Sequence, residues 1–213
     1  MQIILCSAAH CRRMHKSSIA PPELIVYNQT KLLRHQYKTL TSVYPDSEIM
    51  VVIGHNASEI QNEFTDLPIK FICSDNYGTT GPVSSVRIAL SNISYEEVLI
   101  LNGDLYFNEA AIPLERGVTL VENYKDSHRE VGSYIQEGYL KYLSYGAPYT
   151  WSQMILSTSC VVKSCFREGQ FFLCDLVNEM CVDYSIDIQY KKNGIAFDID
   201  SYRDLALARE MPL

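Results

Sequence analysis

Short apolar runs alternate with amphipathic segments over the first half of the chain. The apolar runs at residues 2–8, 48–53 and 69–73 predict strands, and residues 30–44 and 57–64 carry apolar positions at helical spacing. This alternation is typical of βαβ units, which set parallel strands side by side through right-handed crossovers. We therefore expect a parallel sheet with helices packed on it, and Thr30 as the N-cap of the first helix.

The run Val98-Leu99-Ile100-Leu101 predicts a further strand, preceded by a helix that begins near Pro82. Four aliphatic residues without alternation suit a strand that is covered on both faces, so this strand should be central. It ends abruptly on Asn102-Gly103-Asp104. Ligands of open α/β sheets bind beyond the carboxyl ends of the strands, which makes Asp104 a candidate site residue. The alternative is a plain turn, because all three residue types are common in turns.

The pattern changes after residue 107. Residues 118–121, 130–134 and 138–142 are short, rich in tyrosine and partly alternating, which indicates antiparallel strands or hairpins. Residues 154–160 are expected to form a strand that returns to the main sheet, and residues 171–181 a helix. Residues 185–190 predict another strand, and residues 201–211 a last helix capped by Ser201.

Tyr139, Tyr142, Tyr145 and Tyr149 gather near the single tryptophan, Trp151. Such a cluster either packs the edge of a small sheet or forms a wall against which a base or sugar rests. The sequence leaves both readings open.

The chain has 213 residues without a linker or repeat, and we predict one domain over residues 1–213. Its net charge of -7 argues against a nucleic-acid partner, which would require a basic face. A small anionic substrate is compatible with this charge, because basic residues or a metal can reverse the field inside a cleft.

The seven cysteines are an odd number, without a Cys-x-x-Cys pair, and most lie in apolar runs. Free thiols of this kind are typical of a reducing compartment. The sequence also shows no signal-peptide pattern and no apolar stretch as long as a membrane span. We therefore expect a cytoplasmic protein without a membrane partner.

Four segments, in this order and spacing, carry a family resemblance: residues 3–9, 78–82, 101–104 and 197–205. The chain resembles the nucleotidyltransferases that join a nucleoside triphosphate to a sugar phosphate or to a similar phosphate such as phosphocholine. The resemblance implies an α/β fold, a Rossmann-like three-layer sandwich with a mainly parallel central sheet and a small antiparallel insertion. Nucleotide-sugar glycosyltransferases share that fold in outline, as nucleotide-diphospho-sugar transferase-like proteins.

The implied reaction is an attack of the substrate phosphate on the α-phosphorus of the triphosphate, with pyrophosphate leaving and Mg²⁺ as cofactor. The resemblance makes Asp104 a metal ligand and has Asp198 or Asp200 supply a second carboxylate. Alternation along an extended segment puts both of these acids on one face, with Ile199 turned away. The alternative reading of this pair is a turn before a helix N-terminus, where acids are favoured. Further residues are implied to contact the nucleotide: Ala8, Ala9, His10, Gly78, Thr80, Gly81, Asn102 and Gly103.

The sequence departs from the family in its phosphate loop. The family has Ala-Ala-Gly-x-Gly-x-x-Arg, but His10 and Arg12 stand at the two glycine positions. Bulky side chains there prevent the same close approach of the backbone to phosphates. The family's catalytic lysine is matched by Pro22, so Arg12, Arg13 or Lys16 would have to supply its charge, or Lys31 from the helix start.

Three functions follow as hypotheses. The first is a divergent nucleotidyltransferase that acts on a nucleotide and a phosphorylated small molecule. The second is a glycosyltransferase of related fold that uses a ready-made nucleotide-sugar, which would explain the altered loop. The third is a non-catalytic nucleotide-binding protein. The oligomeric state, including a homo-oligomer, stays open.

Overall fold

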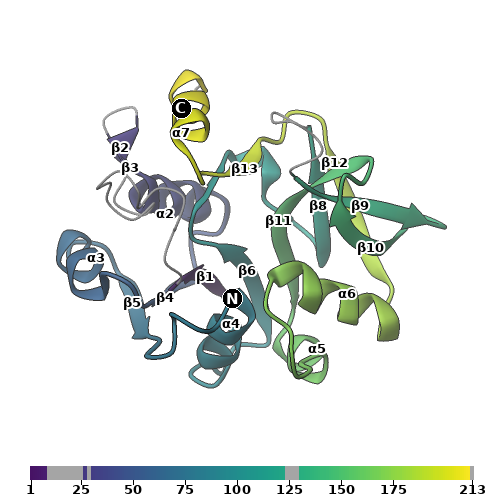
Figure 1. Ribbon diagram of the computed structural model, residues 1–213, viewed down its shortest axis with the longest axis horizontal. Coiled ribbons are helices and arrows are strands. Elements are labelled where there is room, and N and C mark those ends of the chain that lie inside the picture. Colours follow the sequence, from purple (N-terminus) through teal and green to yellow (C-terminus); the bar gives the residue numbers. More distant parts are fainter. Residues whose placement is uncertain (9–25, 28–29, 123–129, 212–213) are drawn as a thin grey trace.

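The structure, a computed structural model, describes residues 1–8, 26–27, 30–122 and 130–211. One nine-stranded sheet runs through it in the order β5-β4-β1-β6-β11-β8-β12-β10-β9 (Figure 1). The strands are β1 (Gln2–Ser7), β4 (Glu48–Ile53), β5 (Ile69–Cys73), β6 (Glu97–Asn102), β8 (Gly117–Val121), β9 (Val131–Gln136), β10 (Tyr139–Tyr145), β11 (Tyr149–Thr158) and β12 (Ile186–Lys191).

Two short strand pairs and the helices complete the described part of the chain. The pairs are β2 (Val26–Tyr27) with β3 (Thr30–Lys31), and β7 (Leu105–Phe107) with β13 (Ala196–Asp198). The helices are α2 (Leu32–Val43), α3 (Ala57–Glu63), α4 (Pro82–Leu90), the short 3-10 helix η2 (Glu109–Ala111), α5 (Ser159–Ser164), α6 (Leu173–Asp183) and α7 (Tyr202–Glu210).

The first half of the sheet is parallel, as the sequence predicts. β1 pairs with β4 on one side and β6 on the other, and β4 pairs with β5, all in parallel register. Residues 98–101 of β6 are fully buried, which fits a strand covered on both faces. Because β6 lies between β1 and β11, it is a central strand.

The second half corrects the expected small antiparallel insertion. β11 pairs antiparallel with β6, and the strands β11, β8, β12, β10 and β9 then pair in turn until β9 returns to β11, closing a five-stranded barrel. The sheet as a whole is therefore mixed rather than mainly parallel. Each of these five strands thereby has a partner on both sides, although β9 and β11 are paired over only two residues each. The register shift between Trp151 and Ile155 is the kind of bulge that lets a strand bend.

Helices cover both faces of the parallel half. Alternate residues of β1 separate into two cores: Ile3 packs with residues of α2 and α3, and Ile4 packs with residues of α4 and α6. A third cluster joins α7 to Tyr106 and Phe197 of the β7–β13 pair. The turn after β6 bonds both to Cys6 in β1 and to Ile199, directly after β13.

Two predicted helix caps have different outcomes. Thr30 lies in β3, and α2 begins at Leu32 with Lys31 as an N-cap that makes no side-chain bond, so the expected Thr30 cap is wrong. The Ser201 cap is confirmed, since its hydroxyl accepts from the backbone N–H of Asp204. No helix of the described residues is long and apolar enough to cross a membrane.

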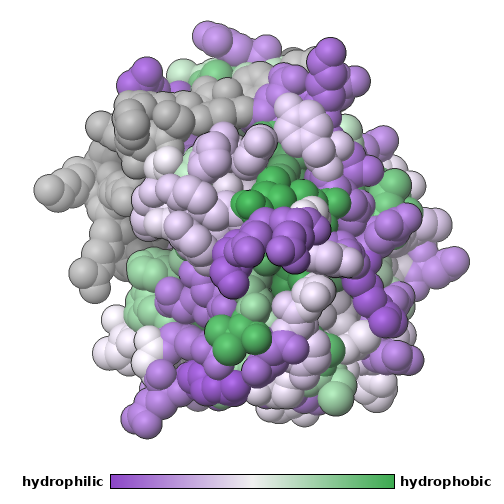
Figure 2. Space-filling view, turned by 90° about the vertical axis from the view of Figure 1, so that its right-hand side faces the viewer, coloured by the Kyte–Doolittle hydropathy of each residue, from purple (hydrophilic) through white to green (hydrophobic). Residues whose placement is uncertain are grey.

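The tyrosine cluster lies on the outside of the barrel strands. The face in Figure 2 is mostly hydrophilic or neutral, with small separate hydrophobic patches. Tyr139, Tyr142, Tyr145 and Tyr149 are exposed, whereas Trp151 is 3% exposed and its indole N–H donates to the carbonyl oxygen of Met154 at 2.9 Å. Trp151 is thus a core residue, whereas the four tyrosines are exposed.

Candidate active site

The turn Asn102-Gly103-Asp104 stands at the carboxyl end of β6, and the half-buried Asp104 begins the return into β7. The backbone N–H of Gly103 donates to the carbonyl oxygen of Cys6 in β1 at 3.0 Å. A Cβ atom at position 103 would lie 1.6 Å from the hydroxyl oxygen of Ser7. Only glycine therefore lets β1 pass so close to this turn.

Helix α2 holds the same turn from another side. The side-chain amide nitrogen of Gln36 donates to the carbonyl oxygens of Gly103, at 2.9 Å, and of Leu105, at 2.8 Å. Gln36 is completely buried. The two residues that flank Asp104 are thus both bonded to one side chain.

The segment after β13 reaches the turn from the far end of the sequence. β13 runs antiparallel to β7 with Asp198 opposite Leu105, and the N–H of Ile199 donates to the carbonyl oxygen of Asp104 at 2.9 Å. Ile199 is fully buried, while Asp198 and Asp200 are half-buried. The predicted alternation is confirmed, and the two acidic segments lie side by side.

The carboxylate of Asp104 contributes to the pKa of a thiol inside the sheet. Burial, and secondly the nearby Asp104 carboxylate, raise the pKa of the Cys6 thiol well above its ordinary value. Cys6 is therefore a protonated, unreactive thiol at neutral pH, and the ionisable group of chemical interest at this place is the carboxylate.

The donor set suits a hard cation. Carboxylate oxygens of Asp104 and of Asp198 or Asp200 are the ligands that Mg²⁺ prefers, and Mg²⁺ takes its other ligands from water and phosphate. Among the described residues, no group of three or more His, Cys, Asp or Glu side chains is placed to hold a metal. A cation held by fewer protein carboxylates would take its remaining ligands from water or phosphate.

The amide of Asn102 is also engaged beside this turn. Its nitrogen donates to the side-chain oxygen of Gln153 in β11 at 3.0 Å, and its own buried oxygen has no partner in the part of the chain that the structure describes. Gln153 has a left-handed backbone, with φ of 61°, which is uncommon for a residue other than glycine. The contact links β6 to the bulged part of β11.

The predicted phosphate-side residues are described only at their start. Ala8 is buried directly after β1, and its carbonyl oxygen accepts from the N–H of His55 at 3.2 Å. The other residues proposed for this side lie outside the described residues: Ala9, His10, Arg12, Arg13, Lys16 and Pro22.

The predicted base-side turn leads into α4. The Thr80 hydroxyl donates to the carbonyl oxygen of Asn76 at 2.9 Å, Gly78 is exposed, and Gly81 is buried against Phe171. The carbonyl oxygen of Phe171 accepts from the N–H of Val83 at 3.2 Å and so caps the first turn of α4.

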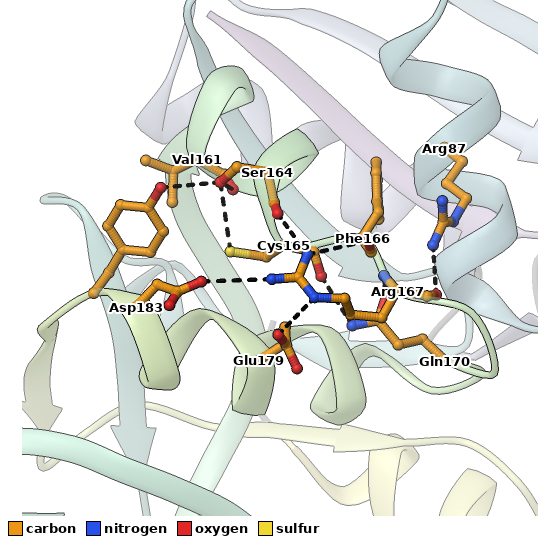
Figure 3. A network of polar contacts seen from close by, with 10 residues as sticks. Arg87, Val161, Ser164, Cys165, Phe166, Arg167, Gln170, Glu179 and Asp183 are labelled. Atoms are coloured by element: carbon orange, nitrogen blue, oxygen red, sulfur yellow. Dashed lines mark hydrogen bonds and ion pairs between the residues drawn. The ribbon is translucent and has the colours of Figure 1, made fainter.

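Thr80 and Gly81 also line an open groove of about 570 Å³ between α4 and the loop at residues 166–171. Figure 3 shows the network that holds this loop: the Arg167 guanidinium pairs with Glu179 at 2.9 Å and Asp183 at 3.5 Å, and Arg87 donates to the carbonyl oxygen of Arg167 at 2.7 Å. Since Arg167 already has two acidic partners, the network supports the loop rather than a free cationic site.

Sequence reasoning missed Gln36, Gln153 and Phe171 as parts of this region. A signal existed only for Gln36, a polar residue on a buried helix face that also carries Thr39 and the leucines Leu32, Leu33 and Leu40. The roles of the other two depend on contacts between segments distant in sequence.

A sequence model of one family, described as the MobA-like NTP transferase domain, matches residues 3–140. Among solved structures, the inositol-1-phosphate CTP transferase from T. maritima is similar with a TM-score of 0.79 at 12% identity, covering 98% of this chain and 96% of that one. No curated protein sequence matches.

Two further solved structures are similar over nearly the whole chain. A putative glucose-1-phosphate thymidylyltransferase from Bacillus anthracis has a TM-score of 0.77 at 14% identity, covering 100% of this chain and 97% of that one. HddC from Yersinia pseudotuberculosis, complexed with GMP-PN, has a TM-score of 0.72 at 14% identity, covering 98% of each chain. At these identities the likeness establishes the α/β fold.

Proposed function

Because the chain belongs to the family of MobA-like NTP transferase domains, we propose that it transfers a nucleotidyl group from a nucleoside triphosphate to a phosphorylated small molecule and releases pyrophosphate. The observation that carries this proposal is the meeting of two acidic segments at the carboxyl end of β6, where the N–H of Ile199 bonds to Asp104. That edge of an α/β sheet is where ligands bind.

In this proposal Asp104 and either Asp198 or Asp200 bind Mg²⁺, which would neutralise charge on the triphosphate. The carboxylates lie on two segments tied by backbone bonds, so the fold fixes the separation of the backbones that carry them. Asn102 and Gly103 belong to the same turn and border the nucleotide. Gly78, Thr80 and Gly81 form its base side.

Nucleotidyl transfer also needs cations at the phosphates. Pro22 stands where the family has its lysine, and Arg12, Arg13 and Lys16 are the residues of the neighbouring stretch that carry positive charge. We assign them to charge neutralisation at the α-phosphate. Their substitution is expected to lower the rate of pyrophosphate release more than it lowers stability.

A thermal-shift panel tests the proposal directly. The panel consists of nucleoside triphosphates, nucleoside diphosphates and nucleotide-sugars, each with and without Mg²⁺, measured on the unmodified chain and on Asp104→Asn. A triphosphate that raises the melting temperature only with Mg²⁺, and only when Asp104 is present, supports the proposal. The best candidates then enter an assay for pyrophosphate exchange.

Each other outcome points elsewhere. Mg²⁺-dependent stabilisation by a nucleotide-sugar or diphosphate, without pyrophosphate exchange, would favour the glycosyltransferase. Nucleotide binding that Asp104→Asn leaves unchanged, with no metal-dependent turnover, would favour a non-catalytic nucleotide-binding protein. Either result would overturn nucleotidyl transfer.

A further inference from the structure

Gln36 contacts the Asp104 turn in a way that goes beyond filling the core. Its amide nitrogen has two hydrogens, and both are used, one on the carbonyl oxygen of Gly103 and one on that of Leu105, at 2.9 and 2.8 Å. These are the residues immediately before and after Asp104. One rigid amide plane therefore fixes the backbone on both sides of the candidate metal ligand.

Among the described residues, the side-chain oxygen of Gln36 has no hydrogen-bond partner, although the residue is 0% exposed. A buried polar atom without a hydrogen bond lowers the stability of the folded state. Three of the other buried positions on this face of α2, Leu32, Leu33 and Leu40, are leucines without a polar side-chain atom. The amide nitrogen of Gln36 thus bonds to the turn, while the amide oxygen makes no hydrogen bond to a described residue.

The remaining backbone contacts of the turn complete the restraint. The N–H of Gly103 bonds to Cys6, and the carbonyl oxygen of Asp104 bonds to Ile199. With Gln36, four backbone polar atoms of residues 103–105 have partners on three different elements or segments. Rotation of the turn would break several of these bonds at once, so they set the direction in which the Cα–Cβ bond of Asp104 leaves the backbone.

We propose that Gln36 is a positioning residue for Asp104: by clamping the two flanking carbonyl groups it holds the carboxylate in the direction required to bind a divalent cation. This inference rests on the proposed function of Asp104. Partners that orient a metal ligand typically contribute about 10–100-fold to metal affinity.

The adjacent residue of α2 provides a matched control. The ring nitrogen Nε2 of His35 lies 2.7 Å from the carbonyl oxygen of Phe107, also in β7 but two residues beyond Leu105. His35→Phe removes that bond and keeps a ring stacked on Tyr106, whose ring centre lies 5.2 Å away. Gln36→Met removes both donors and keeps a side chain of similar length.

The experiment compares Mn²⁺ binding, followed by electron paramagnetic resonance of the free ion, with thermal unfolding. It uses the full chain and its Gln36→Met, His35→Phe and Asp104→Asn variants, with each triphosphate of the panel. We expect Gln36→Met to weaken Mn²⁺ binding by about 10-fold or more. We expect His35→Phe to lose stability while keeping the Mn²⁺ affinity within about twofold, because it does not touch the residues that flank Asp104.

The outcomes separate the two proposals. If Gln36→Met binds Mn²⁺ as tightly as the unmodified chain while Asp104→Asn does not bind it, the positioning role of Gln36 is overturned. The proposed function is then unaffected. Mn²⁺ binding that Asp104→Asn does not change, or that the unmodified chain lacks, would overturn both. If Gln36→Met does not fold, Gln36→Glu is used instead, since it keeps the shape and supplies at most one donor.

Discussion

The N–H of Ile199 donates a hydrogen bond to the carbonyl oxygen of Asp104 across 2.9 Å. The bond joins the segment after β13 to the turn after β6, and each segment carries acids of the candidate site. Because both residues are held through their backbones, the geometry of this site depends on close packing around the turn. The first prediction concerns that packing.

Gly103→Ala is expected to lower the free energy of unfolding by about 2–3 kcal/mol, because the new methyl group would lie 1.6 Å from the Ser7 hydroxyl oxygen. Urea unfolding measures the loss. Adding Ser7→Gly should restore part of it, because the obstructing side chain is gone. Gly78→Ala is the control, since nothing lies within 4 Å of a Cβ there. Equal effects of the two glycine substitutions would contradict the close approach.

We expect the protein to lose stability in acid because of the partly buried imidazole of His35. Burial, opposed by the bond to Phe107, lowers the pKa of His35 below its ordinary value of 6.5. Below pH 6.5 the imidazole of His35 is protonated in the unfolded chain but still neutral in the folded chain. The free energy of unfolding should therefore decrease as the pH falls, by up to about 1.4 kcal/mol per pH unit between the unfolded-state and folded-state pKa values of His35.

His35→Gln tests this origin, because the amide can donate to Phe107 without titrating. Urea unfolding between pH 7 and about pH 5 should show a smaller loss for the variant than for the unmodified chain. Parallel curves would assign the acid sensitivity to other groups.

The β9–β10 hairpin predicts a stabilising substitution. Glu137 and Gly138 form its turn, with φ of 54° and 86°, and two positive φ angles are typical of a type I′ turn. Asn tolerates this conformation better than Glu, so Glu137→Asn should raise the free energy of unfolding by about 0.5–1 kcal/mol. Thermal unfolding provides the measurement.

Gln153→Asn is the informative contrast. It relieves a similar backbone angle, φ of 61°, but its shorter side chain loses the bond from Asn102 at 3.0 Å. We expect no net gain in stability from this variant. A gain as large as that of Glu137→Asn would mean that the Asn102–Gln153 contact contributes nothing measurable.

Arg167→Gln should lower the free energy of unfolding by about 1 kcal/mol or less at low ionic strength, because its ion pairs with Glu179 and Asp183 are partly exposed. Repeating the urea unfolding at roughly 0.5 M NaCl should reduce the difference, since salt screens exposed pairs. A difference that salt does not change would point to lost packing of the loop instead.

The sequence by itself determined the parallel first half of the sheet and the burial of Ile199. The uninterrupted apolar run of β6 predicts a central strand, and the Asp-Ile-Asp alternation places Ile199 inward. These predictions succeed because burial and side-chain periodicity act locally, and each pattern is decided within a few residues. The role of Asp104 at the turn after β6 stays a prediction. The family resemblance is confirmed by the match over residues 3–140. It relates the separate motifs to one another by their order along the chain.

Only the tertiary structure decided how the second half closes and what holds Asp104. The barrel requires β9 to pair with β11, and no local pattern states which strand a given strand will pair with. The clamp from Gln36, the approach of Ser7 to Gly103 and the bond from Ile199 each join segments far apart in the chain. Such contacts arise from packing of the whole fold. The sequence therefore predicts an acid at the strand end, whereas the surrounding elements determine how its backbone is held.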